Sequence, residues 1–328
     1  MTARQRLVIG GGLVALMFAS VASLAFGAVA VSPGRIVAAL TGSADGPDAT
    51  IVADVRLPRT LLAVIVGAAL GLAGALLQGA LANPLAAPDV VGVTAGAAFG
   101  AVAILLLAPA SSALLPAAAL GGGLVAAALV VLAAAPGPRG GGVGGVRIIL
   151  AGIAVGALFT AATTAVMVWR SDRAPAAVVW LAGGLTGRGW EHLEMAAPYM
   201  LVGTVAAGLL ARPLDLLALG DDLAGALGVR ASLVRVAATA AAAVLAAAAA
   251  AVAGLLGFLG LVVPHIARLA GGPGHRYLLV ASAVLGAAVL VAADTVARTA
   301  LAPSELPVGV LTVALGVPFF LHLLRRHA

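Results

Sequence analysis

The sequence has no cysteine and no lysine, and few of its residues are charged or aromatic. Without cysteine the chain has no disulfide, no thiolate metal site and no cysteine nucleophile. Without lysine it cannot form the phosphate-binding loop of an ATPase, in which a lysine follows the glycines. Charged residues make up only 9% of the chain and aromatic residues 4%, which is far less charge than a soluble domain carries.

Most of the remaining sequence is apolar, with 63% hydrophobic residues and a mean hydropathy of +1.18. A transmembrane helix needs about 20 apolar residues, and polar or Pro/Gly-rich breaks divide this chain into ten such segments. We therefore predict an all-α, polytopic membrane protein with one membrane domain over residues 1–328. The expected spans are residues 7–31, 60–82, 90–108, 113–135, 148–169, 193–211, 236–255, 258–270, 277–297 and 306–324.

The first segment resembles a signal peptide in its charge and position. Its apolar run of about 25 residues is longer than the roughly 7 to 15 of a signal peptide, and we interpret it as the first span. Pro264 predicts that residues 258–270 form a short or kinked span.

The breaks differ in character. We expect residues 32–59 to form a loop and 136–147 a glycine-rich loop. Residues 170–194 are expected to form a loop that includes a short interfacial helix, anchored by Trp169, Trp180 and Trp190. Residues 212–235 combine charges with short apolar groups, which indicates small amphipathic helices outside the bilayer. Glycines four residues apart, such as Gly67 with Gly71, predict close helix packing rather than function.

The arginines indicate an orientation. With the N-terminus inside, eleven of the 18 arginines fall on inner breaks and seven on outer ones, as the positive-inside rule requires. The longest basic run is the pair Arg325 and Arg326, so a nucleic-acid partner is not expected.

Ionisable residues are scarce within the spans. Asp294 is the deepest carboxylate, and we expect it to pair with Arg298 four residues later; His265 is interpreted as a local hydrogen-bonding group. Neither a protease motif nor paired carboxylates occur, so an intramembrane enzyme is not expected. The scarcity of charge also disfavours a gradient-driven secondary transporter, which remains an alternative, as does a structural membrane scaffold.

Several motifs together carry a resemblance that none carries alone. They are RLPR (56–59), GALLQGALANPLAAPDVVGVTAGA (74–97), LGDDLAGALGV (219–229), GFLGLVVPHIARL (257–269), HRYLLV (275–280) and ADTVARTALAPSELPVGVLTVALGVPFF (293–320). In this order they resemble the FecCD family, the permease subunits of ABC importers for ferric siderophores, haem and cobalamin.

The resemblance implies a type II ABC importer permease fold with ten helices per protomer. It implies a homodimer around a central path, two copies of an ATPase below and a substrate-binding protein docking above. The expected location is the bacterial cytoplasmic (inner) membrane, surrounded by lipid, with both termini cytoplasmic. No cofactor and no protein metal site are expected, because the metal stays in its chelator.

The resemblance also assigns residues. Arg56, Arg59 and Arg298 are similar to the arginines that receive acidic residues of the binding protein; the alternative is that they anchor headgroups. Asn83, Pro84 and Leu85 resemble a cytoplasmic gate, or mark only a helix break. The coupling segment, which could instead be a solvated loop, lies within 212–235 and comprises Asp221, Asp222, Leu223, Ala224, Leu227 and Gly228.

The substrate is not distinguished by any of these motifs. A ferric siderophore or haem is the favoured expectation, and cobalamin is the alternative within the same family.

Overall fold

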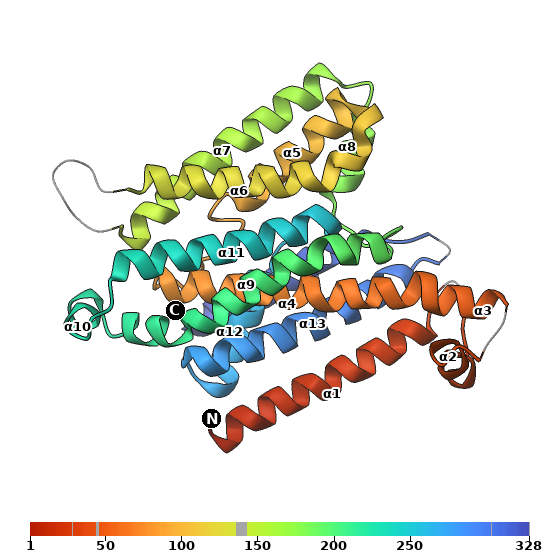
Figure 1. The fold of residues 1–328 in the computed structure, drawn as a ribbon, viewed down its shortest axis with the longest axis horizontal. Helices are drawn as coiled ribbons and strands as arrows, with labels where there is room; N and C mark the ends of the chain where they lie inside the picture. Colours follow the sequence, from red (N-terminus) through yellow and green to blue (C-terminus); the bar gives the residue numbers. More distant parts are fainter. Residues whose placement is uncertain (28, 44–45, 136–142, 303, 328) are drawn as a thin grey trace.

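The computed structural model describes residues 1–27, 29–43, 46–135, 143–302 and 304–327, and over this part of the chain it is helical (Figure 1). Within the described residues, seven helices are long and apolar enough to cross a membrane, and three shorter apolar helices bring the total to ten. The predicted all-α polytopic fold is therefore confirmed. The ten are α1 (Ala3–Ala25), α4 (Leu57–Ala80), α5 (Val93–Leu107), α6 (Leu115–Ala133), α7 (Gly145–Trp169), α9 (Trp190–Leu217), α11 (Ala231–Ala253), α12 (Leu259–Gly271), α13 (His275–Thr299) and α14 (Val308–His327).

Short helices cap the two ends of this bundle. The helix α10 (Asp221–Ala226) lies at one end, toward which the chain's two termini also lie (Figure 1). The helices α2 (Pro33–Leu40), α3 (Pro47–Thr50) and α8 (Ala174–Leu181) lie at the opposite end. A 3₁₀ turn over Pro109–Leu114 precedes α6. The bundle thus carries short helices at both of its ends.

The region expected to be a loop before α4 is partly helical instead. After α2, the chain forms α3 and then a π-helical turn over Ile51–Arg56 that leads directly into α4. Pro58 has no N–H to donate, and the wider π turn absorbs the resulting mismatch; the N–H of Leu57 bonds to the carbonyl of Val52. This continuous helix, and not a loop, positions Arg56.

Other boundaries also differ from the expected ones. The helix α9 continues to Leu217, so the segment 212–235 begins inside a helix and only α10 stands apart in it. The predicted interfacial helix forms as α8, but its Trp180 is buried, while Trp169 and Trp190 are exposed. Residues 136–142 of the glycine-rich loop lie outside the described residues.

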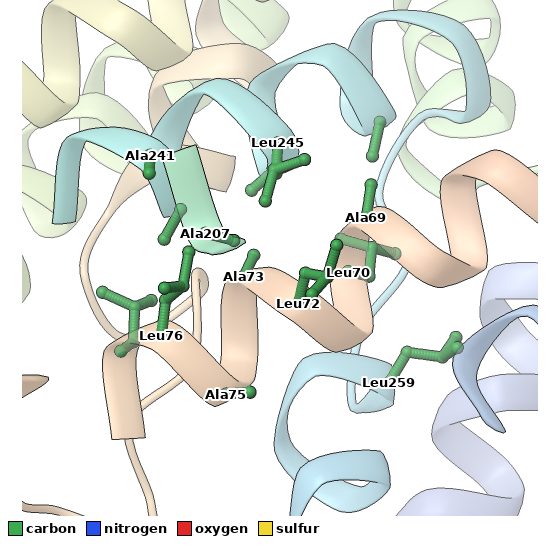
Figure 2. Packing of buried hydrophobic residues seen from close by; sticks show 14 of the residues in the cluster. Ala69, Leu70, Leu72, Ala73, Ala75, Leu76, Ala207, Ala241, Leu245 and Leu259 are labelled. Atoms are coloured by element: carbon green, nitrogen blue, oxygen red, sulfur yellow. The ribbon is translucent and has the colours of Figure 1, made fainter. Parts of the chain in front are cut away.

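The core of the bundle surrounds α4, most of whose residues are buried. In Figure 2, apolar side chains of α4 lie between α11 and α9 on one side and Leu259 of α12 on the other. The alanines of α11 allow this approach because their side chains are short. In lipid, such packing stabilises helix association through van der Waals contact rather than through transfer out of water.

Glycines on α4 bring it into direct backbone contact with its neighbours. A Cβ placed on Gly67 or Gly71 would overlap the carbonyl oxygens of Gly286 or Ser282 on α13. A Cβ on Gly74 would overlap the carbonyl of Gly260 on α12. The four-residue glycine spacing therefore serves packing, as the sequence predicts.

Candidate functional site

Arg56, Arg59 and Arg298 lie at the end of the bundle that carries α2 and α3, and we call them the outer cluster after the side of the membrane predicted from the sequence. The cluster is centred on Arg59. Its Nη2 lies 2.9 Å from Asp294 Oδ1 and its Nε lies 3.0 Å from Asp294 Oδ2. Its Nη1 lies 3.0 Å from Glu305 Oε2, which also accepts a 2.6 Å bond from the hydroxyl of Thr186. Arg59 is thus shared between a buried carboxylate on α13 and a half-buried one in the following loop.

The expected pair of Asp294 with Arg298 is wrong in this structure, because Arg59 takes both oxygens of Asp294. A planar guanidinium facing a carboxylate side-on makes two parallel bonds, which a neighbour on the same helix is badly placed to match. Arg298 instead turns to α1 and donates to the carbonyl and the hydroxyl of Ser23. That hydroxyl lies 2.7 Å from Thr60 Oγ1 on α4.

Arg56 completes the cluster, and its hydrogen bonds within the described part of the chain go to backbone carbonyls. Its guanidinium donates to the carbonyls of Leu24 and Ala25, the last two residues of α1, and to that of Val29 beyond the helix. The structure therefore brings Arg56, Arg59 and Arg298 to one end of the bundle, as the docking prediction requires.

All three arginines are nevertheless buried, with 5–7% of their surface exposed, and they already bind groups of the same chain. Of the three guanidinium groups, Arg59 forms the ion pairs with Asp294 and Glu305, whereas Arg56 and Arg298 bind carbonyl and hydroxyl oxygens. Glu305 is the more accessible carboxylate, with 31% of its side chain exposed. Burial acts to raise the pKa of Glu305, but bonds from Thr186 and Arg59 hold it below its ordinary value. The docking role remains a prediction.

The turn after α4 contains the NPL motif, at the end of the bundle that carries α10. Asn83 Oδ1 accepts a 2.8 Å bond from the N–H of Leu85, which is the side-chain turn expected of asparagine. Ala82 has a φ of +48°, and 45% of Leu85 is exposed. The predicted helix break is confirmed, and a gating role for it remains a prediction.

The last turns of α4 are held by polar contacts that the sequence analysis missed. The buried Gln78 donates to the carbonyl of Leu261 over 3.1 Å and accepts from Arg268 Nη2 over 3.0 Å. A glutamine in a hydrophobic run was the available signal, since a buried amide requires partners. These bonds fix α4 to α12 just before the NPL turn.

A second missed contact joins α4 to α9 through α13. The backbone N–H and the Nδ1 of His275 lie 2.7 and 2.8 Å from Asp215 Oδ1. The imidazole packs against Gly79, where a Cβ would overlap its Nε2. Gly79 therefore has to be glycine for His275 to occupy this position.

The predicted coupling helix forms as α10. Val229 N–H bonds to Ala224 O and Gly228 N–H to Gly225 O, each over 2.9 Å. This is a Schellman cap, and Gly228 supplies its left-handed residue with a φ of +82°. Gly228 thus ends the helix, as predicted.

The exposed face of α10 is apolar. Leu223 and Leu227 are each 58% exposed, Ala224 is buried, and Asp221 and Asp222 are exposed in the first turn. Two neighbouring exposed leucines on a helix outside the apolar spans form a surface suited to a partner. The coupling role itself remains a prediction.

Arg235, in the second turn of α11, links α10 to α4. Its Nη1 and Nη2 lie 2.8 and 2.6 Å from the two oxygens of Asp221. Its Nε donates to Ala80 O over 3.2 Å and its Nη1 to Val143 O over 3.3 Å. The bond from Arg235 holds the pKa of Asp221 below its usual value. The sequence analysis counted Arg235 only as one of the arginines on the inner side of the membrane and predicted no contact for it.

Two further features bear on transport. Within the described residues, no group of three or more His, Asp or Glu side chains is placed to hold a metal ion. A cavity of about 510 Å³ is lined mainly by apolar residues, together with Asp89 and Thr94. Burial raises the pKa of Asp89 above its usual value.

Comparison with known proteins identifies the family of the chain, while the roles of these residues remain predictions. The model of the FecCD transport family matches residues 15–326. The chain belongs to the FecCD transport family. It is therefore a permease subunit of an ABC importer of the cytoplasmic membrane and not an enzyme, and it works with a separate ATPase and a substrate-binding protein.

Relatives within the FecCD family are similar over most of their length. The chain is 41% identical over 315 residues to the Fe(3+)-citrate import system permease protein YfmE of Bacillus subtilis (strain 168), covering 96% of this chain and 93% of that one. It is 40% identical to the Fe(3+) dicitrate transport system permease protein FecD of Escherichia coli (strain K12), covering 84% and 85%. It is also 40% identical to the cobalamin import system permease protein BtuC of Halobacterium salinarum, covering 84% and 73%.

The fold is similar to that of a solved transporter, described as of the metal-chelate ABC type and in an inward-facing conformation. The two structures agree with a TM-score of 0.86 and 29% sequence identity, over 98% of this chain and 99% of the other. The predicted permease fold is thus confirmed.

Proposed function

We propose that this FecCD permease moves an intact ferric chelate from a substrate-binding protein into the cytoplasm. The observation that carries the proposal is the likeness to a metal-chelate transporter over 98% of the chain, together with 41% identity to a ferric citrate permease. Cobalamin is the second candidate, because a cobalamin permease is 40% identical.

The binding protein docks, in this proposal, at the outer cluster of Arg56, Arg59 and Arg298. The gathering of three arginines at this end of the bundle favours an acidic partner. Because these arginines are buried, docking carboxylates have to displace groups of the permease itself. Glu305 is the group that a docking carboxylate would displace from Arg59, since it is the more exposed of the two carboxylates bound there.

The ATPase binds, in this proposal, to the exposed apolar face of α10. Leu223 and Leu227 would insert into the partner, and the Schellman cap at Gly228 holds α10 as a rigid unit. ATP binding then moves α10, and the NPL turn of Asn83, Pro84 and Leu85 opens as the cytoplasmic gate. The exposure of Leu85 supports this role.

We place α10 and both termini in the cytoplasm. The two termini lie toward the same end of the bundle as α10 (Figure 1), and the arginine count of the sequence favours that end as the inner one. Two copies of the chain assemble around a central path, surrounded by lipid, and each copy engages one ATPase.

Uptake by cells tests the proposal. Cells lacking this chain, with and without the chain restored, are supplied with labelled ferric citrate, ferric hydroxamates, haem and cobalamin. Selective and restorable loss of a ferric chelate supports the proposal, and selective loss of cobalamin identifies the second candidate. Unchanged uptake of all four would contradict the proposed substrate class.

A further inference from the structure

Helix α10 packs against α9 and α11, and its polar side holds Arg235 of α11. The guanidinium takes both oxygens of Asp221, the first residue of α10, in a two-bond fork. Such a fork fixes the orientation of the two groups as well as their separation. Arg235 is therefore held in one geometry relative to the start of α10.

The same guanidinium also forms a hydrogen bond with the end of α4. It donates to the carbonyl of Ala80, the last residue of that helix, which is three residues before Asn83. This carbonyl belongs to the final turn of α4, where backbone carbonyls have no partner within the helix. The side chain of Arg235 is largely enclosed, with 11% exposed, while that of its partner Asp221 is 56% exposed.

We infer that Arg235 is a positioning residue that transmits movement of α10 to the NPL turn through Asp221 on one side and Ala80 O on the other. The inference rests on the proposed function, in which α10 receives the ATPase and the NPL turn is the gate. It adds a direct mechanical route between them. Outward movement of α10 either pulls Arg235 away from Ala80 O or carries the end of α4 with it.

The contact of Asp215 with His275 supports this route by holding its surroundings in place. Through this contact, α9 is joined to His275 at the start of α13. The ring of His275 packs on Gly79, which directly precedes Ala80 in α4. Gln78 holds α12. Because these contacts fix the turn of α4 before Ala80, a displacement of Ala80 is expected to move the residues that follow it.

The absence of cysteine makes a direct test possible in the full-length chain. Leu85→Cys provides a unique thiol at the NPL turn, and its reaction rate with a maleimide in lipid nanodiscs reports how freely the turn opens. Asp221→Asn cuts the fork while leaving the bonds of Arg235 to Ala80 O and Val143 O possible. We expect it to raise the rate about threefold or more, which is the size of coupling through packed networks.

Further variants separate transmission from loss of structure. Arg235→Gln should raise the rate by a similar factor, and the double variant should react no faster than the faster single one. Asp221→Glu, which keeps the charge, should restore the original rate. Arg276→Gln changes an exposed arginine at the start of α13 and should have no effect. A second reporter, Val37→Cys on α2, should not respond, because only general loosening would reach it.

An unchanged rate at Leu85→Cys in the Asp221→Asn chain would overturn the inference, as would an equal rise at Val37→Cys. Neither result depends on substrate or ATPase, so failure here is distinguishable from failure of the uptake experiment. In the complete importer, Asp221→Asn should lower the number of chelates imported per ATP hydrolysed. Loss of assembled complex alone would lower uptake and hydrolysis together and leave that ratio unchanged.

Discussion

Arg59 lies between two carboxylates that differ in exposure. We therefore expect one of them to stabilise the fold and the other to be available for exchange with a docking partner. Asp294 is 1% exposed and Glu305 is 31% exposed in their side chains. A buried carboxylate without its cation carries a large desolvation cost, whereas a half-exposed one can exchange its partner with little penalty. The pair with Asp294 therefore serves the fold, and the bond to Glu305 is available for exchange.

Removing one partner of the buried pair should destabilise the protein. We expect Arg59→Gln to lower the free energy of unfolding by about 3 to 5 kcal/mol, because Asp294 is left as an uncompensated charge. Adding Asp294→Asn should recover part of this loss. Unfolding in mixed micelles measures both, with Arg35→Gln as the control, since Arg35 pairs with Asp48 at the surface and should change stability by less than about 1 kcal/mol. Equal losses of unfolding free energy in the single and double variants would contradict a stabilising pair of Arg59 with Asp294.

Removing the charge of Glu305 should strengthen docking. Glu305→Gln keeps the shape of the side chain but weakens the competitor for Arg59, so we expect tighter binding of the substrate-binding protein, by a few-fold and most clearly at low salt. Binding to the permease in nanodiscs, followed by surface plasmon resonance, measures this change. Glu191→Gln is the control, because Glu191 is an exposed carboxylate. Weaker binding to the Glu305→Gln protein would instead show that Glu305 itself contacts the partner.

At the scale of the elements, α4 depends on backbone contact with α12 and α13. Gly74→Ala places a methyl group against the carbonyl of Gly260, and we expect a loss of stability of about 1 to 3 kcal/mol from overpacking. Gly208→Ala on α9 is a matched control, since a Cβ there meets no atom within 4 Å. It should be neutral or stabilising by up to about 1 kcal/mol. Thermal unfolding in detergent compares the two, and equal midpoints would argue against the close contact.

Helix α10 should act as a separable docking element. We expect Leu223→Ser with Leu227→Ser to weaken ATPase binding at least about tenfold, because each exposed leucine loses apolar contact in the complex. The fold of the permease should be unaffected, since neither side chain belongs to its core. Co-purification of the ATPase and thermal unfolding measure the two effects. Val37→Ser, at the opposite end, is the control, and retention of the ATPase by the double leucine variant would contradict the assignment.

At the scale of the whole molecule, the proposal requires an assembly. An open pocket of about 510 Å³ lies beside α14, and a central path for a bulky chelate calls for a second copy. Native mass spectrometry of the complex should show two copies of the 31.6 kDa chain with two ATPases. A complex with one copy of this chain would contradict the homodimer.

The sequence by itself determined the class of the protein, because long apolar runs and missing charges permit little besides membrane helices. It also located the NPL turn and the short helix ended by Gly228, since proline, asparagine and glycine act on the local backbone. These features depend on residues close together in the chain. The ordered set of motifs likewise identified the family, which the comparisons confirm.

Only the tertiary structure decided which charges meet. Asp294 pairs with Arg59, 235 positions away, rather than with Arg298 on its own helix, because helix packing and not chain distance sets the approach of the two groups. The contacts of Arg235 with Asp221 and Ala80, and of His275 with Asp215 and Gly79, likewise join separate helices. The burial of Arg56, Arg59 and Arg298 could not be predicted from the sequence either, because it depends on how α1, α4 and α13 pack around them.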